Sequence, residues 1–395
     1  MEKRKLLITD MNSRQLEEHS EQYSGWMVLS PVQKIHPCIG CFSCWKKTPG
    51  RCVFKDGFDE MAALINEADE IVYSSRFTYG GFSSFVKNVF DRSIGYVLPY
   101  FEVSDHEMHH QRRYEEIKNI TFIFRGNHLN PEEKEMAENY VYTVCRNMRN
   151  NVKEVLFEQE EISTEKNISS VQPVKGKTAL LNCSMRGKNA HSEKFLTKMA
   201  DNMKNGYDFY RLSEYQNRMD ELINVITPAE TLVLAMPLYV DGFPSNVIRF
   251  LEKLEEAQCG QGRKIYVLAN LGLYESHQLK NLLSMIRYFC LKTGYQYQGA
   301  AAVGAGELVS VLIDHMKYGP VKNVTRALSV LSEHIDSGEP MDDIYAQPFL
   351  FPRWLYIQIA NRSWDLQARS AGLKPRDLRI RPKMDPKTSL LYIKK

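Results

Sequence analysis

Four of the chain's 8 cysteines lie close together near the N-terminus, with the spacing C-x2-C-x2-C-x7-C. They are Cys38, Cys41, Cys44 and Cys52. Three thiolates two residues apart suit three corners of an iron-sulfur cubane, and a fourth from the same loop completes the set. Structural zinc usually pairs two separate C-x2-C knuckles, which this compact run does not contain. The spacing therefore indicates metal or redox chemistry, with a [4Fe-4S] cluster, zinc, and free or structural thiols as the alternatives.

A second group of polar residues lies between a short apolar run, residues 178–182, and an amphipathic helical pattern. Small hydroxyl and amide residues at a helix N-terminus suit a phosphate monoester, because backbone N–H groups and the helix dipole point at the anion. Arg186 adds a charge-assisted partner. A helix capped by Ser192 or Asn189 is the alternative. The residues predicted to bind phosphate are Ser184, Arg186, Asn189, His191 and Ser192.

The two halves of the chain repeat one order of elements, as a duplicated domain would. Residues 68–73 and 81–86 match residues 229–234 and 242–247 at an offset of 161, and residues 120–124 match 265–269 at an offset of 145. Cys145 and Cys290 also match at the second offset, and their apolar helical setting predicts that both are core residues. Chance similarity between two α/β halves is the alternative.

Each half opens on a short apolar run, residues 5–9 and 178–182, of the kind expected for a buried parallel strand. Helical patterns at residues 58–67, 192–205 and 279–293 alternate with such runs. This alternation predicts an α/β fold with two tandem doubly wound parallel sheets, each a three-layer α/β/α arrangement. Ligands of such sheets bind at the carboxyl ends of the strands.

The first half is predicted to be degenerate. After its opening strand, residues 10–14 lead within a dozen or so residues to the next strand near Trp26, so the phosphate loop and its helix are truncated. The predicted domains are residues 1–165, with the cysteines, and 178–340, joined by a linker over 166–177 and followed by a helical tail over 341–395.

Bulk composition excludes several classes of protein. The 395 residues are too many for one ordinary core and fit two domains. Lys and Arg number 51 against 48 Asp and Glu, a net charge of +3 that does not indicate a nucleic-acid binder. No apolar run approaches the ~18 residues of a membrane span, and the N-terminus does not have the pattern of a signal peptide. A cytoplasmic protein is expected, with neither nucleic acid nor a membrane as partner.

The second half resembles the flavodoxin-like NADPH-dependent FMN reductases. Their phosphate loop, Ser-x-Arg-x-x-(x)-Ser, is matched by Ser184, Arg186 and Ser192, and their Pro-x-Tyr loop by residues 237–242. The loop at residues 270–273 occupies the position that closes the flavin ring pocket in that family. The resemblance implies bound FMN, with ring contacts from Pro237, Leu238, Tyr239, Val240, Asp241, Gly242, Asn270, Gly272 and Leu273.

The cysteine segment, from Cys38 through residues 48–52 to Asp56, resembles the compact motif of the iron-sulfur flavoproteins, which carry a [4Fe-4S] cluster beside FMN. The same residues occur as plain thiols in related flavin reductases. The first half has the cysteines without a phosphate loop, and the second has the loop without the cysteines. We therefore expect the tandem chain to divide these features between two domains, with electrons passing between them within a chain or across a dimer.

The expected activity is an NAD(P)H-dependent flavin oxidoreductase that passes electrons from a nicotinamide nucleotide through FMN to an acceptor. The cofactor carries such chemistry, so no catalytic acid or base is assigned. The alternatives are an iron-sulfur flavoprotein electron carrier without a nicotinamide step and a cofactor-free scaffold. The sequence identifies neither the acceptor nor the choice of NADH or NADPH, and the family resemblance implies a homodimer or tetramer.

Two further segments have simpler interpretations. The segment 105–113, with several histidines and charged residues, is predicted to be a solvated charged loop, with a metal site on its histidines as the alternative. The aromatic and basic tail, residues 348–395, is predicted to form an amphipathic helix packed on the body, with an oligomer or partner surface as the alternative.

Overall fold

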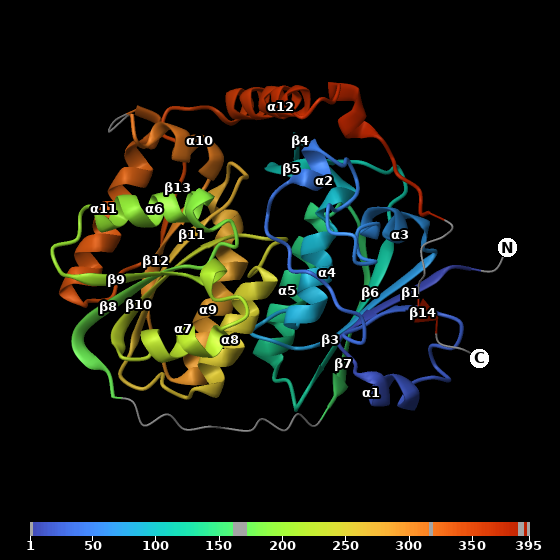
Figure 1. The fold of residues 1–395 in the computed structure, drawn as a ribbon, viewed down its shortest axis with the longest axis horizontal. Helices are drawn as coiled ribbons and strands as arrows, with labels where there is room; N and C mark the ends of the chain where they lie inside the picture. The colour runs from blue at the N-terminus through green and yellow to red at the C-terminus, as the bar shows by residue number, and fades with distance from the viewer. Residues whose placement is uncertain (1–2, 161–171, 316–318, 386–390, 393–395) are drawn as a thin grey trace. The chain divides into compact units, whose positions relative to one another are not determined.

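A computed structural model of the chain describes residues 3–160, 172–315, 319–385 and 391–392. The chain divides into two compact units, and each has its own central sheet (Figure 1). Unit 1 comprises Met1–Ile162 and Ile357–Lys395, and unit 2 comprises Ser163–Tyr356. Part of the predicted linker, residues 166–171, lies outside the described residues, and the first strand of unit 2 begins at Val174.

The sheet of unit 1 has the strand order β14-β2-β1-β3-β6-β7. All neighbouring strands are parallel except β14, which pairs antiparallel with β2. Counted along the chain, the parallel strands have the order 2-1-3-4-5, which is the flavodoxin-like order. The elements are β1 (Lys5–Thr9), α1 (Ser13–Glu18), β2 (Met27–Leu29), α2 (Ser43–Lys46), α3 (Met61–Glu67), β3 (Glu70–Arg76), α4 (Ser84–Arg92), the 3-10 helix η1 (Ile94–Tyr96), β4 (Val97–Ser104), β5 (Glu107–Arg112), β6 (Asn119–Gly126), α5 (Pro131–Asn147), β7 (Asn151–Gln159), η6 (Pro375–Arg379) and β14 (Leu391–Tyr392).

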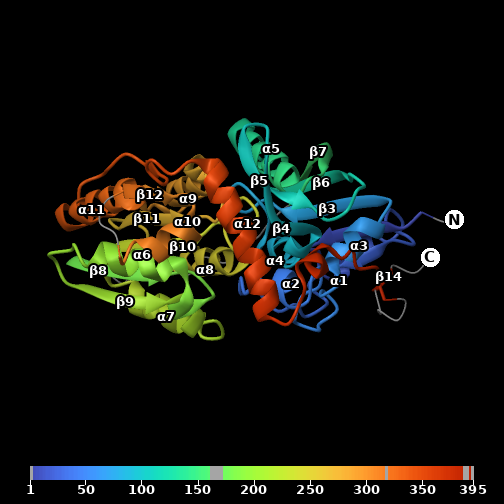
Figure 2. The same cartoon turned by 90° about the horizontal axis from the view of Figure 1, so that it is seen from above.

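The sheet of unit 2 has the order β9-β8-β10-β11-β12-β13, and all of its strands are parallel. Its first five strands repeat the order 2-1-3-4-5, and helices cover both faces (Figures 1 and 2). The elements are β8 (Val174–Asn182), η2 (Gly187–Asn189), α6 (His191–Ala200), β9 (Tyr207–Arg211), η3 (Leu212–Glu214), α7 (Met219–Ile226), β10 (Ala229–Pro237), α8 (Ser245–Glu256), β11 (Lys264–Asn270), η4 (Ser276–Leu279), α9 (Lys280–Thr293), β12 (Gln296–Val303), α10 (Gly306–Leu312), η5 (Gly319–Val321), α11 (Lys322–Ser337) and β13 (Ile344–Ala346).

These two sheets confirm the predicted fold class, tandem flavodoxin-like α/β/α domains. The loops after β3 and β10 carry the same small antiparallel bridge, Thr78 with Gly81 and Tyr239 with Gly242, at the predicted offset of 161. The helices that follow, α4 and α8, begin at the same offset. Local geometry is therefore repeated along with strand order, which favours duplication over chance similarity.

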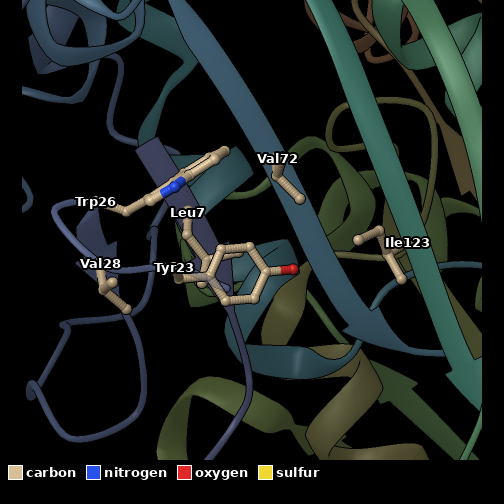
Figure 3. Packing of buried hydrophobic residues seen from close by; sticks show 6 residues of the cluster. All are labelled: Leu7, Tyr23, Trp26, Val28, Val72 and Ile123. Carbon is tan, nitrogen blue, oxygen red and sulfur yellow. The ribbon is translucent and has the colours of Figure 1, made fainter. Parts of the chain in front are cut away.

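Unit 1 is degenerate at its first helix, as predicted. α1 has 6 residues, whereas its counterpart α6 has 10. Aromatic side chains of the loop before β2 cover that face of the sheet, with the rings of Tyr23 and Trp26 edge to face at 5.4 Å (Figure 3). The buried cluster drawn there consists of Leu7, Tyr23, Trp26, Val28, Val72 and Ile123. The apolar surface that a full helix would cover is thus buried by two aromatic residues.

The opposite face of the same sheet carries a stack of aromatic rings. Strand alternation turns Tyr73 and Phe122 away from their neighbours Val72 and Ile123. Tyr73 stacks on Phe90 of α4 with ring centroids 4.2 Å apart. Both faces of β3 and β6 are therefore buried, as expected for central parallel strands.

The helix predicted over residues 192–205 ends at Ala200. The carboxylate of Asp336 accepts the backbone amides of Lys204, at 2.8 Å, and Asn205, at 3.1 Å. These amides therefore bond outside the helix, and a distant residue determines where the helical pattern stops.

The prediction of a solvated loop over residues 105–113 was wrong. β4 and β5 form an antiparallel hairpin there, and the side chains of His109 and Arg113 are buried. The ring of His110 packs 4.6 Å from the rings of both Trp45 and Phe101. The charged and histidine-rich composition concealed the hairpin because its polar groups are satisfied by residues far away in the sequence.

The tail forms a long helix, α12 (Arg353–Ser370), which is continuous in Figures 1 and 2. Trp364 on this helix is buried in unit 1, where its ring meets the rings of Phe42 and Trp45 edge to face. Asn361 accepts the backbone amide of Phe101 at 2.7 Å. The predicted packing of a tail helix on the body is thus seen in unit 1. Across the described residues, no helix has the length and apolarity needed to cross a membrane.

Candidate functional site

The predicted phosphate loop follows β8 and is hydrogen-bonded by the last residue of that strand. Asn182 accepts the backbone amide of Ser184 at 2.9 Å and donates to the carbonyl of Gly187 at 3.0 Å. The N-cap of α6 is Ala190, whose side chain cannot cap the helix. The alternative of a helix capped by Ser192 or Asn189 is therefore contradicted, and the first amides of α6 have no side-chain cap.

Asn270 joins the three loops that were predicted to bind flavin. The hydroxyl of Ser192, in the first turn of α6, donates to the side chain of Asn270 at 2.6 Å. The backbone carbonyl of Asn270 accepts the amide of Leu238 at 2.8 Å. The phosphate loop, the loop after β10 and the loop after β11 thus meet at the carboxyl edge of the sheet, where doubly wound folds bind ligands.

The loop after β10 has a strained backbone. Val240 and Asp241 have φ angles of 38° and 61°, between the bridge partners Tyr239 and Gly242. Non-glycine residues rarely adopt positive φ, and such strain concentrates at ligand sites. At the next loop, a Cβ added to Gly272 would meet no atom within 4 Å, so this exposed backbone is open on one side. The loop after β11 thus leaves backbone accessible at Gly272, one of the predicted ring contacts.

The remaining predicted residues differ in exposure. Ser184 and Ser192 are buried, Arg186 is half-buried, and Asn189 is exposed. His191 lies 2.7 Å from the hydroxyl of Ser310 on α10. Burial, together with the nearby charges of Arg186 and Lys194, lowers the pKa of His191 to about 4. The histidine is therefore neutral at pH 7 and stands in a locally positive environment that would favour an anion.

The cysteines of unit 1 lie on a loop with an irregular backbone. Gly40, Phe42 and Gly50 all have positive φ, at 63°, 56° and 80°. The amide of Cys38 donates to Asn88 of α4 at 3.1 Å, and the amide of Cys52 donates to the carbonyl of Asp59 at 2.9 Å. Both ends of the motif are thus anchored to neighbouring elements.

All four thiols belong to one electrostatic neighbourhood. Burial raises the pKa of Cys38 to about 12, with smaller contributions from Asp91, Cys52 and Cys41. The pKa of Cys44 is also raised, first by burial and then by the other three cysteines. The raised pKa values keep Cys38 and Cys44 protonated at pH 7 when no cation is bound.

Within the described ranges, no group of three or more His, Cys, Asp or Glu side chains is arranged to hold a metal ion. The described residues therefore show no preformed metal site. In a cubane each cysteine binds a different iron, so the four sulfurs are farther apart than around one ion. Four partly exposed thiols within electrostatic reach of one another are compatible with that larger group.

Buried cations lie against the cysteine loop. Arg92 of α4 forms a bidentate pair with Asp56, with both contacts at 2.8 Å. It also interacts electrostatically with Cys52 and Cys38. Arg113, just after β5, is buried, and its positive charge favours the thiolate form of Cys44. Sequence reasoning missed both arginines, because the residues that bind them are dispersed along the chain.

The corresponding edge of unit 1 is occupied by an ion-pair network. Asp10 follows β1, as Cys183 follows β8, and its carboxylate is bound by Arg125 and by Arg76. Arg125 also bonds Glu160 at 2.8 Å. A carboxylate of the chain therefore lies where the phosphate loop of unit 2 begins, which supports the expectation that unit 1 does not hold a flavin phosphate.

Comparisons with known proteins give short sequence matches. No family model matches the chain. It is 39% identical over 61 residues to an iron-sulfur flavoprotein of Methanocaldococcus jannaschii, covering 15% of this chain and 31% of that protein. It is 34% identical over 64 residues to an iron-sulfur flavoprotein of Archaeoglobus fulgidus, covering 16% and 28%. The match spans about a third of the length of these curated relatives.

Among solved structures, a Streptococcus pneumoniae flavodoxin is 14% identical with a TM-score of 0.31, covering 41% of this chain and 99% of that one. An FMN-dependent NADH-azoreductase from Bacillus anthracis is 15% identical with a TM-score of 0.29, covering 41% and 98%. Strand order alone assigns the fold of both units. The chain is therefore a tandem flavodoxin-like protein that resembles the iron-sulfur flavoproteins over a short segment.

Proposed function

We propose that this protein is an FMN-dependent oxidoreductase, with the flavin in unit 2. The observation that carries the proposal is Asn270, whose side chain and backbone join the phosphate loop to both predicted ring loops. Three loops meeting at the carboxyl edge of a 2-1-3-4-5 sheet form the arrangement in which doubly wound folds bind mononucleotides. The short iron-sulfur flavoprotein matches add support for a redox role.

The residues of unit 2 would bind and orient the cofactor. Ser184 would donate its hydroxyl to the phosphate, beside the uncapped amides of α6 and the charge of Arg186, while Ser192, whose hydroxyl donates to Asn270, would hold the phosphate loop against the ring loops. The backbone of residues 237–242 and 270–273 would contact the ring. When bound, FMN supplies hydride acceptance and single-electron transfer, while the protein supplies position and electrostatics.

In unit 1, the same proposal assigns a [4Fe-4S] cluster to Cys38, Cys41, Cys44 and Cys52. Four thiolates and the cluster carry net negative charge, which suits a loop lined by buried arginines. Burial keeps the free thiols of Cys38 and Cys44 protonated, so iron would have to displace their protons on binding.

The proposal also covers the electron donor, the electron acceptor, the cellular compartment and the oligomeric state. A nicotinamide nucleotide would reduce the flavin, and electrons would then pass to a small molecule or a protein. A reducing cytoplasm suits four clustered thiols that form no disulfide. A homodimer is the proposed assembly.

The test is anaerobic purification followed by an absorption spectrum and the FMN, iron and zinc content per chain. The proposal predicts equimolar FMN and about four irons, the content of one cubane. Flavin without iron would leave a simple FMN reductase with structural or reactive thiols. Protein that stays colourless after refolding with excess FMN would refute the flavin site and favour a cofactor-free scaffold.

A second candidate is an electron carrier without its own nicotinamide step, which the cysteine loop and its buried arginines favour. Steady-state oxidation of NADH and NADPH separates the two candidates. Turnover with either nucleotide supports the reductase. A flavin that is reduced by dithionite but by neither nucleotide supports the carrier.

A further inference from the structure

Arg113 is a buried cation whose hydrogen bonds all go to neutral acceptors. Its side chain lies just after β5, and the residue is 1% exposed. Nε donates to the carbonyl of Gly95 at 2.6 Å, and Nη1 donates to the carbonyls of Leu378 and Ile380 at 2.7 and 2.8 Å. Among the residues that the structure describes, no carboxylate lies within ion-pair distance of this guanidinium. Its charge is therefore not neutralised by a side chain of its surroundings.

Neighbouring buried cations, by contrast, form ion pairs with carboxylates. Lys87 of α4 forms an ion pair with Asp91, and Arg92 forms one with Asp56. Burying a charge without a partner is strongly unfavourable, so folded proteins pair such groups or place them beside a bound ion. Arg113 is the cation of this group that lacks a paired carboxylate.

The guanidinium of Arg113 lies against the backbone that carries Cys44. A Cβ added to Gly95, whose carbonyl binds Nε, would lie 3.5 Å from the Cβ of Cys44. A Cβ added to Gly50 would lie 3.6 Å from Nε itself, and the amide of Gly50 donates to the carbonyl of Cys44 at 2.8 Å. The unpaired positive charge thus lies beside the cysteine loop rather than in an unrelated part of the core.

We infer that Arg113 is the counter-charge for the anionic group held by the four cysteines, and that it sets the reduction potential of that group. This inference rests on the proposed iron-sulfur cluster. Reduction adds one electron to a cluster that is already negative, and a fixed positive charge in a low-dielectric environment stabilises the more negative state. Arg113 therefore raises the potential without ligating iron.

Its hydrogen bonds also give Arg113 a positioning role. By binding the carbonyls of Leu378 and Ile380, it holds the segment around η6 close to the cysteine loop, and Pro382 beyond it packs on Gly50. A merely structural role would leave the potential unchanged once the cluster is loaded, so the potential distinguishes the two roles.

The experiment is an anaerobic redox titration of the full-length, iron-loaded protein, followed by electron paramagnetic resonance. Arg113→Met should shift the cluster potential to a more negative value, and Arg113→Lys, which keeps the charge, should stay close to wild type. The flavin potential, measured optically in the same samples, serves as the internal reference for the cluster potential.

A matched variant tests the same charge argument with the opposite sign. Asp56→Asn removes the carboxylate that pairs with Arg92, while the amide oxygen can still accept the backbone bonds of His36 or Phe58. The uncompensated positive charge beside the cysteines then increases, so the potential should become more positive.

Each outcome decides a separate question. Wild-type protein without iron refutes the cluster, and the inference falls with it. Iron-loaded Arg113→Met with an unchanged potential overturns the inference and leaves the cluster intact. If Arg113→Met does not fold or does not load, Asp56→Asn decides: a positive shift supports the charge argument, and an unchanged potential overturns it.

Discussion

At the scale of single residues, Asn270 links the loops of unit 2 that were predicted to bind flavin, through one side-chain and one backbone hydrogen bond. Its side chain accepts the hydroxyl of Ser192, and its backbone carbonyl accepts the amide of Leu238. Because one side chain and one carbonyl serve two loops, moving either loop disturbs both contacts. The geometry of the proposed ring pocket therefore depends on the phosphate loop.

Ser192→Ala should weaken FMN binding up to about tenfold, because it removes the hydrogen bond, contributing ~0.5–1.5 kcal/mol, that joins the phosphate loop to Asn270. Fluorescence titration of the flavin-free protein with FMN measures the change. Ser337→Ala, at an exposed helix end of the same unit, is the matched control and should bind FMN like wild type. Equal affinity for Ser192→Ala and wild type would remove this serine from the site.

The buried imidazole of His110 makes the stability of unit 1 depend on pH. Burial lowers the pKa of His110 to about 4, below the ~6.5 of an unfolded histidine, so the unfolded chain binds the extra proton between these values. This residue therefore contributes its full stability above pH 6.5 and loses it as pH falls towards 4, by up to roughly 3 kcal/mol.

Urea unfolding of the protein at several pH values tests this dependence. His110→Asn should flatten the decline between pH 6.5 and 4, since asparagine keeps a donor and does not titrate. His106→Asn, at the exposed turn of the same hairpin, should retain the wild-type slope. A slope that is identical in all three proteins would contradict the assignment.

At the scale of elements, α12 packs on unit 1 through the ring of Trp364 and through hydrogen bonds of Asn361 and Asp365. Trp364 meets the rings of Trp45 and Phe42 at 5.4 and 5.8 Å. Trp364→Ala should destabilise unit 1 by ~3–5 kcal/mol, the usual cost of deleting a buried aromatic side chain. Chemical denaturation, with hydrogen exchange of the β4 amides as the readout, measures the loss in free energy of unfolding.

The same helix offers a matched control. Trp354 is 60% exposed, so Trp354→Ala should change the free energy of unfolding by less than about 0.5 kcal/mol. If both tryptophan variants unfold at the same urea concentration as wild type, α12 does not stabilise unit 1 through this contact.

Elements differ in how far the sequence could predict them. The parallel strands, α9 and the truncated α1 follow from short apolar runs, helical periodicity and the length between strands. The β4–β5 hairpin was missed because its buried polar groups, His109 and Arg113, find partners such as Asn147 and Ile380 that are distant in sequence. The end of α6 depends likewise on the distant Asp336. The local sequence pattern predicts buried apolar elements well, but it does not predict long-range polar contacts.

The candidate site divides in the same way. The loops were predicted from their positions after strands, and the structure brings Ser192, Leu238 and Asn270 together. The residues beneath and around them, such as Asn182 and Arg92, could not be predicted, because their roles depend on contacts that only the folded chain creates.

At the scale of the whole molecule, the two units should respond to flavin separately. FMN at about 100 times its Kd should stabilise the unit that binds it by ~2.7 kcal/mol. Hydrogen exchange with and without FMN should therefore show new protection in residues 183–192, 237–242 and 270–273. Protection that appears instead after β1, near Asp10, would place the flavin in unit 1 and contradict the proposal.

The carboxylate of Asp10 has one more consequence. It is an anion tethered to the chain, so it occupies the edge of the unit 1 sheet with Arg76 and Arg125 at all times, whatever the supply of external phosphate. Dilution cannot remove it, and no free ligand has to be present for that edge to be neutralised. Folding of unit 1 should therefore not depend on a bound flavin, and protein from cells starved of riboflavin should still contain folded unit 1.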